Sequence, residues 1–456
     1  MKEITIHVLS SVYCHVEEIW GKTFLNSFLN VKKEFWKKGK YHKERKEYTV
    51  PLVDRKGFFL TGFLPRIERE CERRGIKICW SGPEIKIPPF LDTPKLEGIN
   101  LRPDQQSFIY ELLDSKYKRG GLVAPTGVGK TVMAGAIIQC FPESNCLFIC
   151  HTGVRQAYSD FHNFGFKSVG LCTEGQKEFN DARIIVATRQ TFIKIDPDQY
   201  SNYFDVVIHD EGHHFTKFKS EYATIFSNLS APVRLWLTAT PNDNEEAKAA
   251  VEGFIGPLLK RQTIQEAHEL GILAMPKIKI VKTEYDRNIR ELTSYRKANE
   301  LGVIHNRKRN IQIWEEAKEN LDQGKCGLIF VVNIDHGKIL EEMGRKYFNM
   351  DVEFIYGDTK GERREEIRQE LITGKRKCII ASTIWMEIIN IPRLNFVIRA
   401  STGKDDKRTL QIIGRGLRKT DEKDTVTIID FFDPSHPSLV EHFGHRISLY
   451  CEEGWL

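Results

Sequence analysis

"GLVAPTGVGKTVMAGAIIQ", Gly121 to Gln139, contains the strongest local signal in the chain. An apolar run leads into the glycine-rich segment "APTGVGKT", Ala124 to Thr131, and a helical pattern follows it. A strand, a glycine-rich turn, a Lys-Thr pair and a helix, in this order, are the context of a phosphate-binding loop. The alternative is an ordinary glycine turn, which the full spacing and context make the weaker interpretation.

The phosphate-binding interpretation assigns a task to each part of the loop. Gly127 and Gly129 would let backbone N–H groups turn toward the β-phosphate, at the positive end of a helix. Lys130 is expected to reach the β- and γ-phosphates, and the Thr131 hydroxyl to bind Mg²⁺. The loop residues that we expect to hold ATP are Thr126, Gly127, Val128, Gly129, Lys130 and Thr131.

A second motif lies about eighty residues further on, in "VIHDEGHHF", Val207 to Phe215. Asp210 closes an apolar strand, where α/β sheets place their ligands, so it is expected to hold Mg²⁺ and Glu211 to deprotonate water. The alternative is a zinc protease motif, because His209 and His213 lie four residues apart. That motif needs Glu directly after the first His and both His on one helix face, whereas Asp210 follows here and the context is a strand.

Apolar runs alternate with helical patterns from about Leu101 to Asp433, five in each half of this region. Continuous apolar runs are typical of parallel strands buried on both faces, and ten of them exceed one ordinary sheet. Residues 1–96 instead indicate a small α+β domain that ends in a proline-rich linker. The predicted class is α/β, with the small domain at 1–96 and parallel-sheet domains at 97–260 and 261–456.

The positive charge is concentrated at the N-terminal end. The chain has a net charge of +6, whereas residues 1–96 hold nineteen Lys/Arg against twelve Asp/Glu, a net charge of +7. The densest stretch is "KKEFWKKGKYHKERK", Lys32 to Lys46. Basic residues interleaved with aromatics suit a nucleic-acid surface, and the alternative is a solvated helix face. The candidate contacts are Lys32, Lys33, Lys37 and Lys38.

The phosphate loop and "DEGH" together resemble superfamily 2 helicases of the DExH type. The resemblance implies two RecA-like domains, with ATP and Mg²⁺ as cofactors. "LRPDQ" is similar to the adenine-reading Q-motif, with Arg102 and Gln105 as its candidate residues. "LTATP" resembles the motif that links the state of ATP to strand grip, which implies coupling roles for His213, Thr238 and Thr240. "TGVRQAYSDF" and "ATRQTF" resemble motifs that grip the nucleic-acid backbone, and their candidates are Thr152, Thr188 and Gln190.

"QIIGRGLR", Gln411 to Arg418, is similar to helicase motif VI. Gln411, Arg415 and Arg418 are spaced to share one side of a helix, and a guanidinium can bond the transferring phosphate in a bidentate manner. The alternative is a basic helix on a solvated face. At the place of motif V the chain departs from the family, because Ile388 stands where glycine is usual, which puts the motif V contacts in doubt.

Weaker stretches narrow the resemblance to phage branch-migration helicases of the UvsW type, and XPB-like repair helicases share parts of the pattern. They are "AHELGILAMPKIKIV", "NIDHGKILEEM" and "EHFGHRISLYCEEGW". The resemblance implies an ATP-dependent DNA helicase acting on forks or Holliday junctions. Two alternatives remain open. One is the motor subunit of a restriction nuclease, with Asp54 and "EIK", Glu84 to Lys86, as its loosely spaced metal centre. The other is an ATPase clamp on RNA or DNA that does not unwind.

Cysteine usage and hydropathy indicate the compartment. The ten cysteines include no C-x-x-C pair, and no apolar run approaches the about 20 residues that span a membrane. Buried reduced thiols are the simplest interpretation. We therefore expect a cytoplasmic protein, in the host cytoplasm if a phage encodes it.

Overall fold

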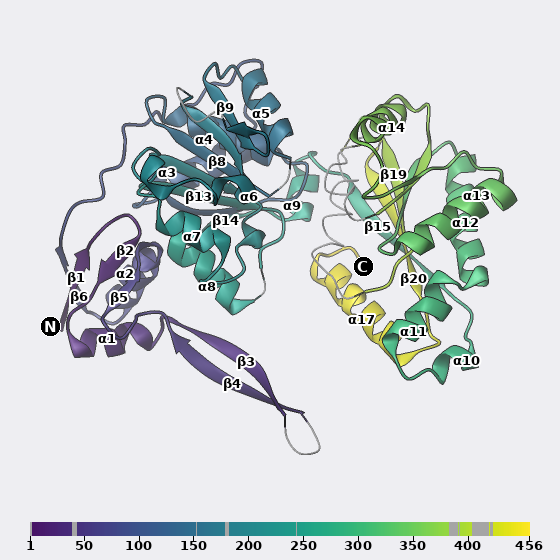
Figure 1. Cartoon of the computed structure of the whole chain (residues 1–456), viewed down its shortest axis with the longest axis horizontal. Helices are drawn as coiled ribbons and strands as arrows, with labels where there is room; N and C mark the ends of the chain where they lie inside the picture. The colour runs from purple at the N-terminus through teal and green to yellow at the C-terminus, as the bar shows by residue number, and fades with distance from the viewer. Residues whose placement is uncertain are drawn as a thin grey trace. The chain divides into compact units, whose positions relative to one another are not determined.

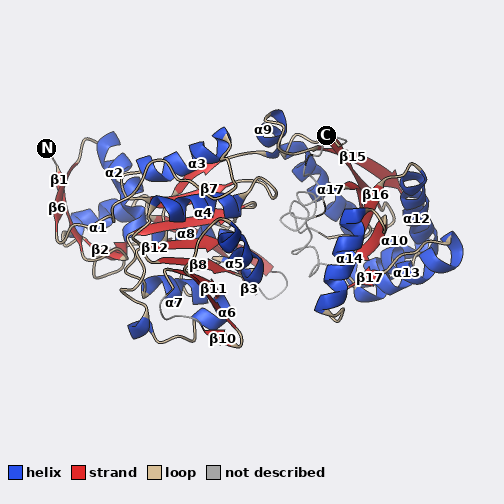
Figure 2. Ribbon diagram, turned by 90° about the horizontal axis from the view of Figure 1, so that it is seen from above, coloured by secondary structure: helices blue, strands red, loops and turns tan. Residues whose placement is uncertain are grey.

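The computed structural model describes residues 2–38, 43–151, 153–177, 182–242, 244–382, 391, 393–403, 419 and 423–456. The chain forms two compact units, of which the first ends at Arg261 and the second begins at Gln262 (Figure 1). Each unit contains a large, mainly parallel sheet with helices around it (Figure 2). The predicted α/β class with two RecA-like parallel-sheet domains is confirmed.

The first unit begins with a small α+β part, whose four-stranded sheet has the order β5-β2-β1-β6. β1 pairs in parallel with β6 and antiparallel with β2, which pairs antiparallel with β5. The elements of this part are β1 (Glu3–Val8), β2 (Tyr13–His15), α1 (Ile19–Asn26), β3 (Asn30–Lys38), β4 (Lys43–Pro51), β5 (Phe58–Leu60), η1 (Thr61–Phe63), α2 (Leu64–Arg73) and β6 (Lys77–Ser81).

Residues 32–38 and 43–46 of the basic stretch lie in the paired strands β3 and β4, so the interpretation of this stretch as a helix face is wrong. The two strands pair antiparallel from Asn30 opposite Pro51 to Lys38 opposite Lys43. Aromatic and β-branched residues, which favour strands, occur along both strands. Their pairing joins positions up to about twenty residues apart, which a local pattern does not reveal.

The small part and the first large sheet share one hydrophobic core, which includes Ile4 and Phe59 of the former and Leu147 of the latter. Buried Arg119, the first residue of β7 (Arg119–Val123), donates hydrogen bonds to the carbonyls of Ser11 at 2.7 Å and Phe254 at 3.0 Å. Burial lowers the pKa of Arg119 to about 10. The small part is thus fixed near the amino-terminal end of β7, and the phosphate loop follows the other end.

The large sheet of the first unit has the order β10-β9-β11-β8-β12-β13-β7-β14, and its strands are parallel except for β10. Its further strands are β8 (Cys146–Cys150), β9 (Val169–Thr173), β10 (Gln176–Lys177), β11 (Ile184–Thr188), β12 (Val206–Asp210), β13 (Val233–Thr238) and β14 (Leu258–Arg261). The helices are α3 (Pro103–Asp114), α4 (Lys130–Cys140), α5 (Val154–Asn163), α6 (Arg189–Phe192), η2 (Pro197–Gln199), η3 (Gly212–His214), α7 (Glu221–Ser227) and α8 (Glu245–Phe254).

The second unit has a parallel sheet of order β15-β20-β19-β16-β18-β17. Its strands are β15 (Met275–Lys282), β16 (Cys326–Phe330), β17 (Phe354–Ile355), β18 (Cys378–Ala381), β19 (Leu394–Arg399) and β20 (Thr425–Phe432). Its helices are α9 (Ile264–Glu269), α10 (Arg287–Arg290), α11 (Tyr295–Asn299), η4 (Glu300–Ile304), α12 (Arg307–Asp322), α13 (Ile334–Phe348), α14 (Gly361–Thr373) and α17 (Pro437–Glu452). A buried ion pair between Arg446 and Asp430, 2.7 Å long, fixes α17 to β20.

All ten apolar runs singled out between Leu101 and Asp433 contain strands, whereas β9, β10, β14 and β15 were not predicted. Of these, β10, β14 and β15 lie at sheet edges, where one side is unpaired and the apolar pattern is weaker. None of the ten cysteines, all within the described ranges, forms a disulfide, and eight are buried. Among the described residues, no helix combines the length and apolarity that crossing a membrane requires.

Candidate active site

The phosphate loop lies between the end of β7 and the start of α4, as predicted. Gly127 and Gly129 have φ angles of 97° and 94°, which an L side chain rarely adopts, so glycine is required at both positions. Gly129 is the residue immediately before α4, so the exposed N–H groups of the helix begin at the loop. Lys130 Nζ donates to the carbonyl of Ala124 at 3.2 Å. The loop therefore has the backbone form that can cradle a phosphate.

The Q-motif residues lie beside this loop at the start of α3. Gln105 is buried, and its Oε1 accepts a hydrogen bond from the Arg102 backbone N–H at 3.2 Å. The Arg102 guanidinium pairs with Asp104 at 3.0 Å. A methyl group on Gly129 would come within 2.6 Å of Gln105 Nε2, which places this amide directly against the phosphate loop. The structure thus brings together two motifs that lie more than twenty residues apart.

Asp210 is the last residue of β12 and lies at the carboxyl edge of the sheet. Burial and, to a smaller extent, the neighbouring Glu211 carboxylate raise its pKa to about 7, although the Lys130 ammonium acts in the opposite direction. The Lys130 ammonium is therefore near enough to Asp210 to lower the pKa of its carboxyl. Its carboxylate and the Thr131 hydroxyl are oxygen donors of the kind that Mg²⁺ prefers, so this pair fits the expected metal.

Glu211 has an unusual backbone, with a φ of 57° in the left-handed region. Such a conformation costs about 1–3 kcal/mol for a residue with a side chain and is commonest at functional sites. It turns the chain sharply between β12 and η3.

A small network joins Glu211 to the end of β13. The Glu211 Oε2 atom lies 3.2 Å from His213 Nδ1 and accepts a hydrogen bond from Thr238 Oγ1 at 3.4 Å. His213 Nδ1 and Thr238 Oγ1 lie 2.9 Å apart. Thr240 N–H donates to Thr238 Oγ1 at 3.2 Å. Of the three residues expected to couple ATP state to grip, His213 and Thr238 therefore contact each other and the candidate base, and Thr240 contacts Thr238.

The two histidines of the zinc alternative lie in different environments. His209 is fully buried, with its ring 4.2 Å from that of Tyr222 and 5.8 Å from that of Phe226. Burial lowers its pKa well below the usual value. His213 instead contacts Glu211 and Thr238, so the pair does not converge on one ion. Within the described residues, no cluster of three or more His, Cys, Asp or Glu is arranged to hold a metal.

The candidate nucleic-acid contacts are distributed over several elements. Thr188 precedes α6 with its Oγ1 3.1 Å from Thr191 Oγ1, and Gln190 is exposed. Lys32 is exposed, whereas Lys33 forms a 2.8 Å ion pair with Glu246, which compensates its charge. The structure gives the backbone of Lys37 and Lys38 in β3 and does not describe their side chains. The candidates Thr152, Gln411, Arg415 and Arg418, and the departure at Ile388, lie outside the described residues.

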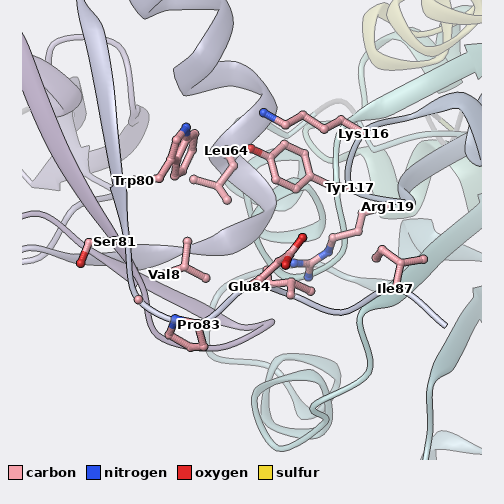
Figure 3. A pocket seen from close by; sticks show the side chains of 12 residues that line it. Val8, Leu64, Trp80, Ser81, Pro83, Glu84, Ile87, Lys116, Tyr117 and Arg119 are labelled. Atoms are coloured by element: carbon pink, nitrogen blue, oxygen red, sulfur yellow. The ribbon is translucent and has the colours of Figure 1, made fainter.

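A pocket of about 490 Å³ lies apart from the ATP motifs, between the small part and the first large sheet (Figure 3). Its wall includes Trp80, Tyr117 and Arg119, and Lys116 Nζ lies 5.5 Å from the centre of the Trp80 ring. Because Arg119 begins β7 and the phosphate loop follows Val123, the pocket is at the amino-terminal side of the sheet. We assign it to the joint between the two parts.

Two family models match the chain. "Type III restriction enzyme, res subunit" matches residues 98–243, and "Helicase conserved C-terminal domain" matches residues 309–420. The chain is a superfamily 2 helicase. The helicase is accordingly a nucleic-acid-dependent ATPase. The first match covers the phosphate loop, Asp210 and Thr238, and the second covers the motif VI segment.

The chain is also similar to individual proteins. The helicase is 26% identical to the DNA 3'-5' translocase XPB2 of Sulfurisphaera tokodaii over 366 residues, 72% of this chain and 80% of that protein. A fragment of a putative HsdR subunit of a type I restriction enzyme from Vibrio vulnificus shares the fold, with TM-score 0.58, 19% identity and 85% and 71% of the two chains covered. The structure of T4 UvsW aligns over 99% of this helicase and 98% of UvsW, with 20% identity and TM-score 0.46.

Sequence reasoning did not identify Asn242 or the left-handed backbone of Glu211. Asn242 Nδ2 donates to the His213 carbonyl at 2.6 Å and to the Phe215 carbonyl at 3.4 Å. Its position directly after "LTATP" could have indicated this role, because a polar side chain that follows a buried strand often forms hydrogen bonds with nearby backbone groups. The pairing of Lys33 with Glu246 had no local signal, since 213 residues separate them.

Proposed function

We propose that this helicase is a DNA translocase that uses ATP to unwind or branch-migrate forked DNA and Holliday junctions in recombination, repair or replication. The observation that supports a motor most directly is the network of Glu211, His213 and Thr238. A motor must relay the state of its hydrolysis site to another element, and this network joins the candidate base to the end of β13. DNA as the substrate is supported by the name of the S. tokodaii relative, a DNA 3'-5' translocase.

The hydrolysis itself would follow from the residues around the phosphate loop. Lys130 would bind the β- and γ-phosphates, Gln105 would bond the adenine edge, and Glu211 would take the proton from the attacking water. Mg²⁺, when bound through Thr131 and Asp210, neutralises charge on the phosphates. From the second domain, Arg415 and Arg418 would bond the transferring phosphate, with Gln411 beside them.

We further propose that the chain works as three parts, 1–96, 97–260 and 261–456, of which the first supplies contacts to the substrate. Its net charge of +7 supports this role, and the branched character of the DNA rests on the resemblance to UvsW-type phage helicases. Within this type, we propose a resemblance to a compact phage relative such as the T5 branch-migration helicase. We place the protein in the cytoplasm, or the host cytoplasm if a phage encodes it, where thiols stay reduced.

The restriction-motor alternative has support from the first family model and from the HsdR fold. Its candidate nuclease residues, however, are far apart in the small sheet. Asp54 precedes β5 and Glu84 follows β6, and these strands are the two opposite edges of the four-stranded sheet. Three strand spacings of about 4.8 Å separate the two edges, too far for both carboxylates to bind one metal ion.

Unwinding assays on three substrates separate the candidate functions. A synthetic Holliday junction, a tailed DNA duplex and an RNA duplex of equal length are each incubated with wild type and with Glu211→Gln. We expect ATP-dependent separation of the junction arms by wild type only. ATPase activity stimulated by DNA without any strand separation would favour the clamp, and metal-dependent cutting of linear DNA would favour the restriction motor.

A further inference from the structure

The β3–β4 hairpin is built as a free-standing ribbon. Each strand has nine residues, about 30 Å at the usual rise per residue, and the two form a separate two-stranded sheet (Figure 1). An isolated two-stranded hairpin is only marginally stable in water, so its position depends on how its base is held. The element is therefore suited to present its sides to a partner.

The charges on the ribbon indicate a polyanion as that partner. Lys38 lies directly opposite Lys43 near the far end, the next pair is Lys37 with Glu44, and nearer the base Glu34 lies opposite Glu47. Like charges directly opposite each other destabilise a strand pair, and a bound anion would offset this at the Lys38–Lys43 pair. Over both strands the residues described include seven basic and three acidic positions, namely Lys32, Lys33, Lys37, Lys38, Lys43, Arg45 and Lys46 against Glu34, Glu44 and Glu47.

The base of the ribbon is fixed to α8. Lys33 Nζ forms the 2.8 Å ion pair with Glu246, and both side chains are largely shielded, with 30% and 23% of their surface exposed. The Lys32 backbone N–H donates to Glu245 Oε2 at 3.1 Å. Val31 is buried beside these contacts. Both glutamates lie in the first turn of α8, so the direction of the ribbon is set by the start of this helix.

The start of α8 is in turn linked to the ATP site. The helix follows β13 after a loop of six residues, and Asn242 in that loop donates to the carbonyl of His213. His213 contacts Glu211 and Thr238, as described above. Glu211 is thus linked to the start of α8, where the ribbon is held, by contacts of 3.4 Å or less and by the loop between β13 and α8. A change at the end of β13 would therefore reach the ribbon through α8.

We propose that the β3–β4 hairpin is an arm that binds duplex DNA in a groove, and that Glu246 is the positioning residue that ties this arm to the ATP site. The proposal rests on the proposed function, because it names the contact through which the motor holds its DNA. A two-stranded ribbon fits the major groove of B-DNA, which is about 12 Å wide. Lys33 anchors the arm, and the excess of basic over acidic positions in its two strands suits it to the phosphate backbone.

Charge reversal at the anchor gives a sharp test. Glu246→Lys leaves two lysines facing each other and raises the net charge of the protein by two. If charge alone decided affinity, this variant would bind DNA more tightly. Displacement of the arm predicts the opposite, about tenfold weaker binding to a plain duplex. It also predicts that the slope of log K against the logarithm of the salt concentration becomes less steep by about 2–3. Each lost phosphate contact reduces that slope by about 0.9.

Two variants serve as controls. Lys33→Glu/Glu246→Lys restores the pair in reversed order and should return duplex affinity to within about twofold of wild type, which distinguishes arm position from misfolding. Glu143→Lys makes the same charge change at an exposed site after α4. It should bind duplex DNA at least as tightly as wild type. Thermal unfolding of all three variants and of wild type accompanies the titrations.

These outcomes test the arm independently of the proposed function, because DNA binding is measured without ATP. Equal duplex affinity and equal salt slopes for Glu246→Lys and Glu143→Lys would overturn the arm, as would failure of the reversed pair to recover binding. Preference of wild type for single strands or RNA over duplex DNA would overturn it too. Tight duplex binding by wild type without any unwinding would instead overturn the helicase function and leave the arm in place.

Discussion

Replacing Glu211 by Gln tests the assignment of the general base with the smallest change in shape. The amide keeps the length of the side chain and an oxygen that can accept the hydrogen bond from Thr238, which is 3.4 Å long in the wild type. It also keeps the left-handed backbone, because Gln and Glu have the same steric demands at a φ of 57°. What it removes is the basicity of the carboxylate and its attraction to His213.

The expected loss can be sized from these contacts. General-base help contributes about 10²- to 10⁴-fold to a rate, which corresponds to about 2.7–5.4 kcal/mol in the activation barrier. Affinity for ATP should change little, since Lys130, Thr131 and Asp210 are the expected phosphate and Mg²⁺ contacts.

Phosphate release at saturating ATP and DNA measures the rate, and a fluorescent ATP analogue measures affinity. His213→Ala removes the group that contacts the same carboxylate while leaving the base, so it should lose stimulation by DNA more than hydrolysis without DNA. Turnover of Glu211→Gln within tenfold of wild type, with normal ATP affinity, would refute the assignment.

Three further predictions concern the metal, the loop and the second unit. Excess EDTA should stop hydrolysis and added Mg²⁺ restore it, whereas a zinc-selective chelator should leave the rate unchanged in the same phosphate-release assay. Gly129→Ala should weaken ATP binding at least tenfold in a fluorescence titration, because a φ of 94° strains a residue with a side chain and the new methyl group would lie 2.6 Å from Gln105 Nε2. Arg446→Ala should lower the unfolding free energy of the second unit by about 3–5 kcal/mol in a urea titration, because it leaves buried Asp430 without its bidentate partner.

The sequence was sufficient for the parts of the fold whose signal is local. β8, β12 and β13 are continuous apolar runs because both of their faces are buried, and such runs are visible without knowing the neighbours. The phosphate loop and Asp210 were predicted because each combines a strand end with a fixed chemical pattern. Strand ends of a parallel sheet meet at one edge, so the proximity of Lys130 and Asp210 also followed from the order of elements.

The remaining features depend on contacts between residues far apart in the chain. The β3–β4 hairpin has aromatic and charged residues that suit a helix face or a solvated strand equally well, and only the pairing of the two strands decides between them. β14 and β15 have alternating or mixed patterns because sheet edges are partly exposed. The left-handed backbone of Glu211 is set by the turn from β12 into η3, and a glutamate in the sequence does not predict such a backbone.

The division at residue 96 shows how charge and folding can follow different boundaries. Composition changes there, because the positive excess lies entirely before it. Packing does not change there, since Ile4 and Leu147 belong to one core and Arg119 holds the Ser11 carbonyl. A basic surface attached through a flexible linker would move independently of ATP. Here the small part is packed against the sheet that carries the phosphate loop, and its hairpin is bonded to α8. A substrate contact built into the same body as the hydrolysis site can respond to that site through short bonds, and this is the physical reason to expect that the arm and the ATPase act together.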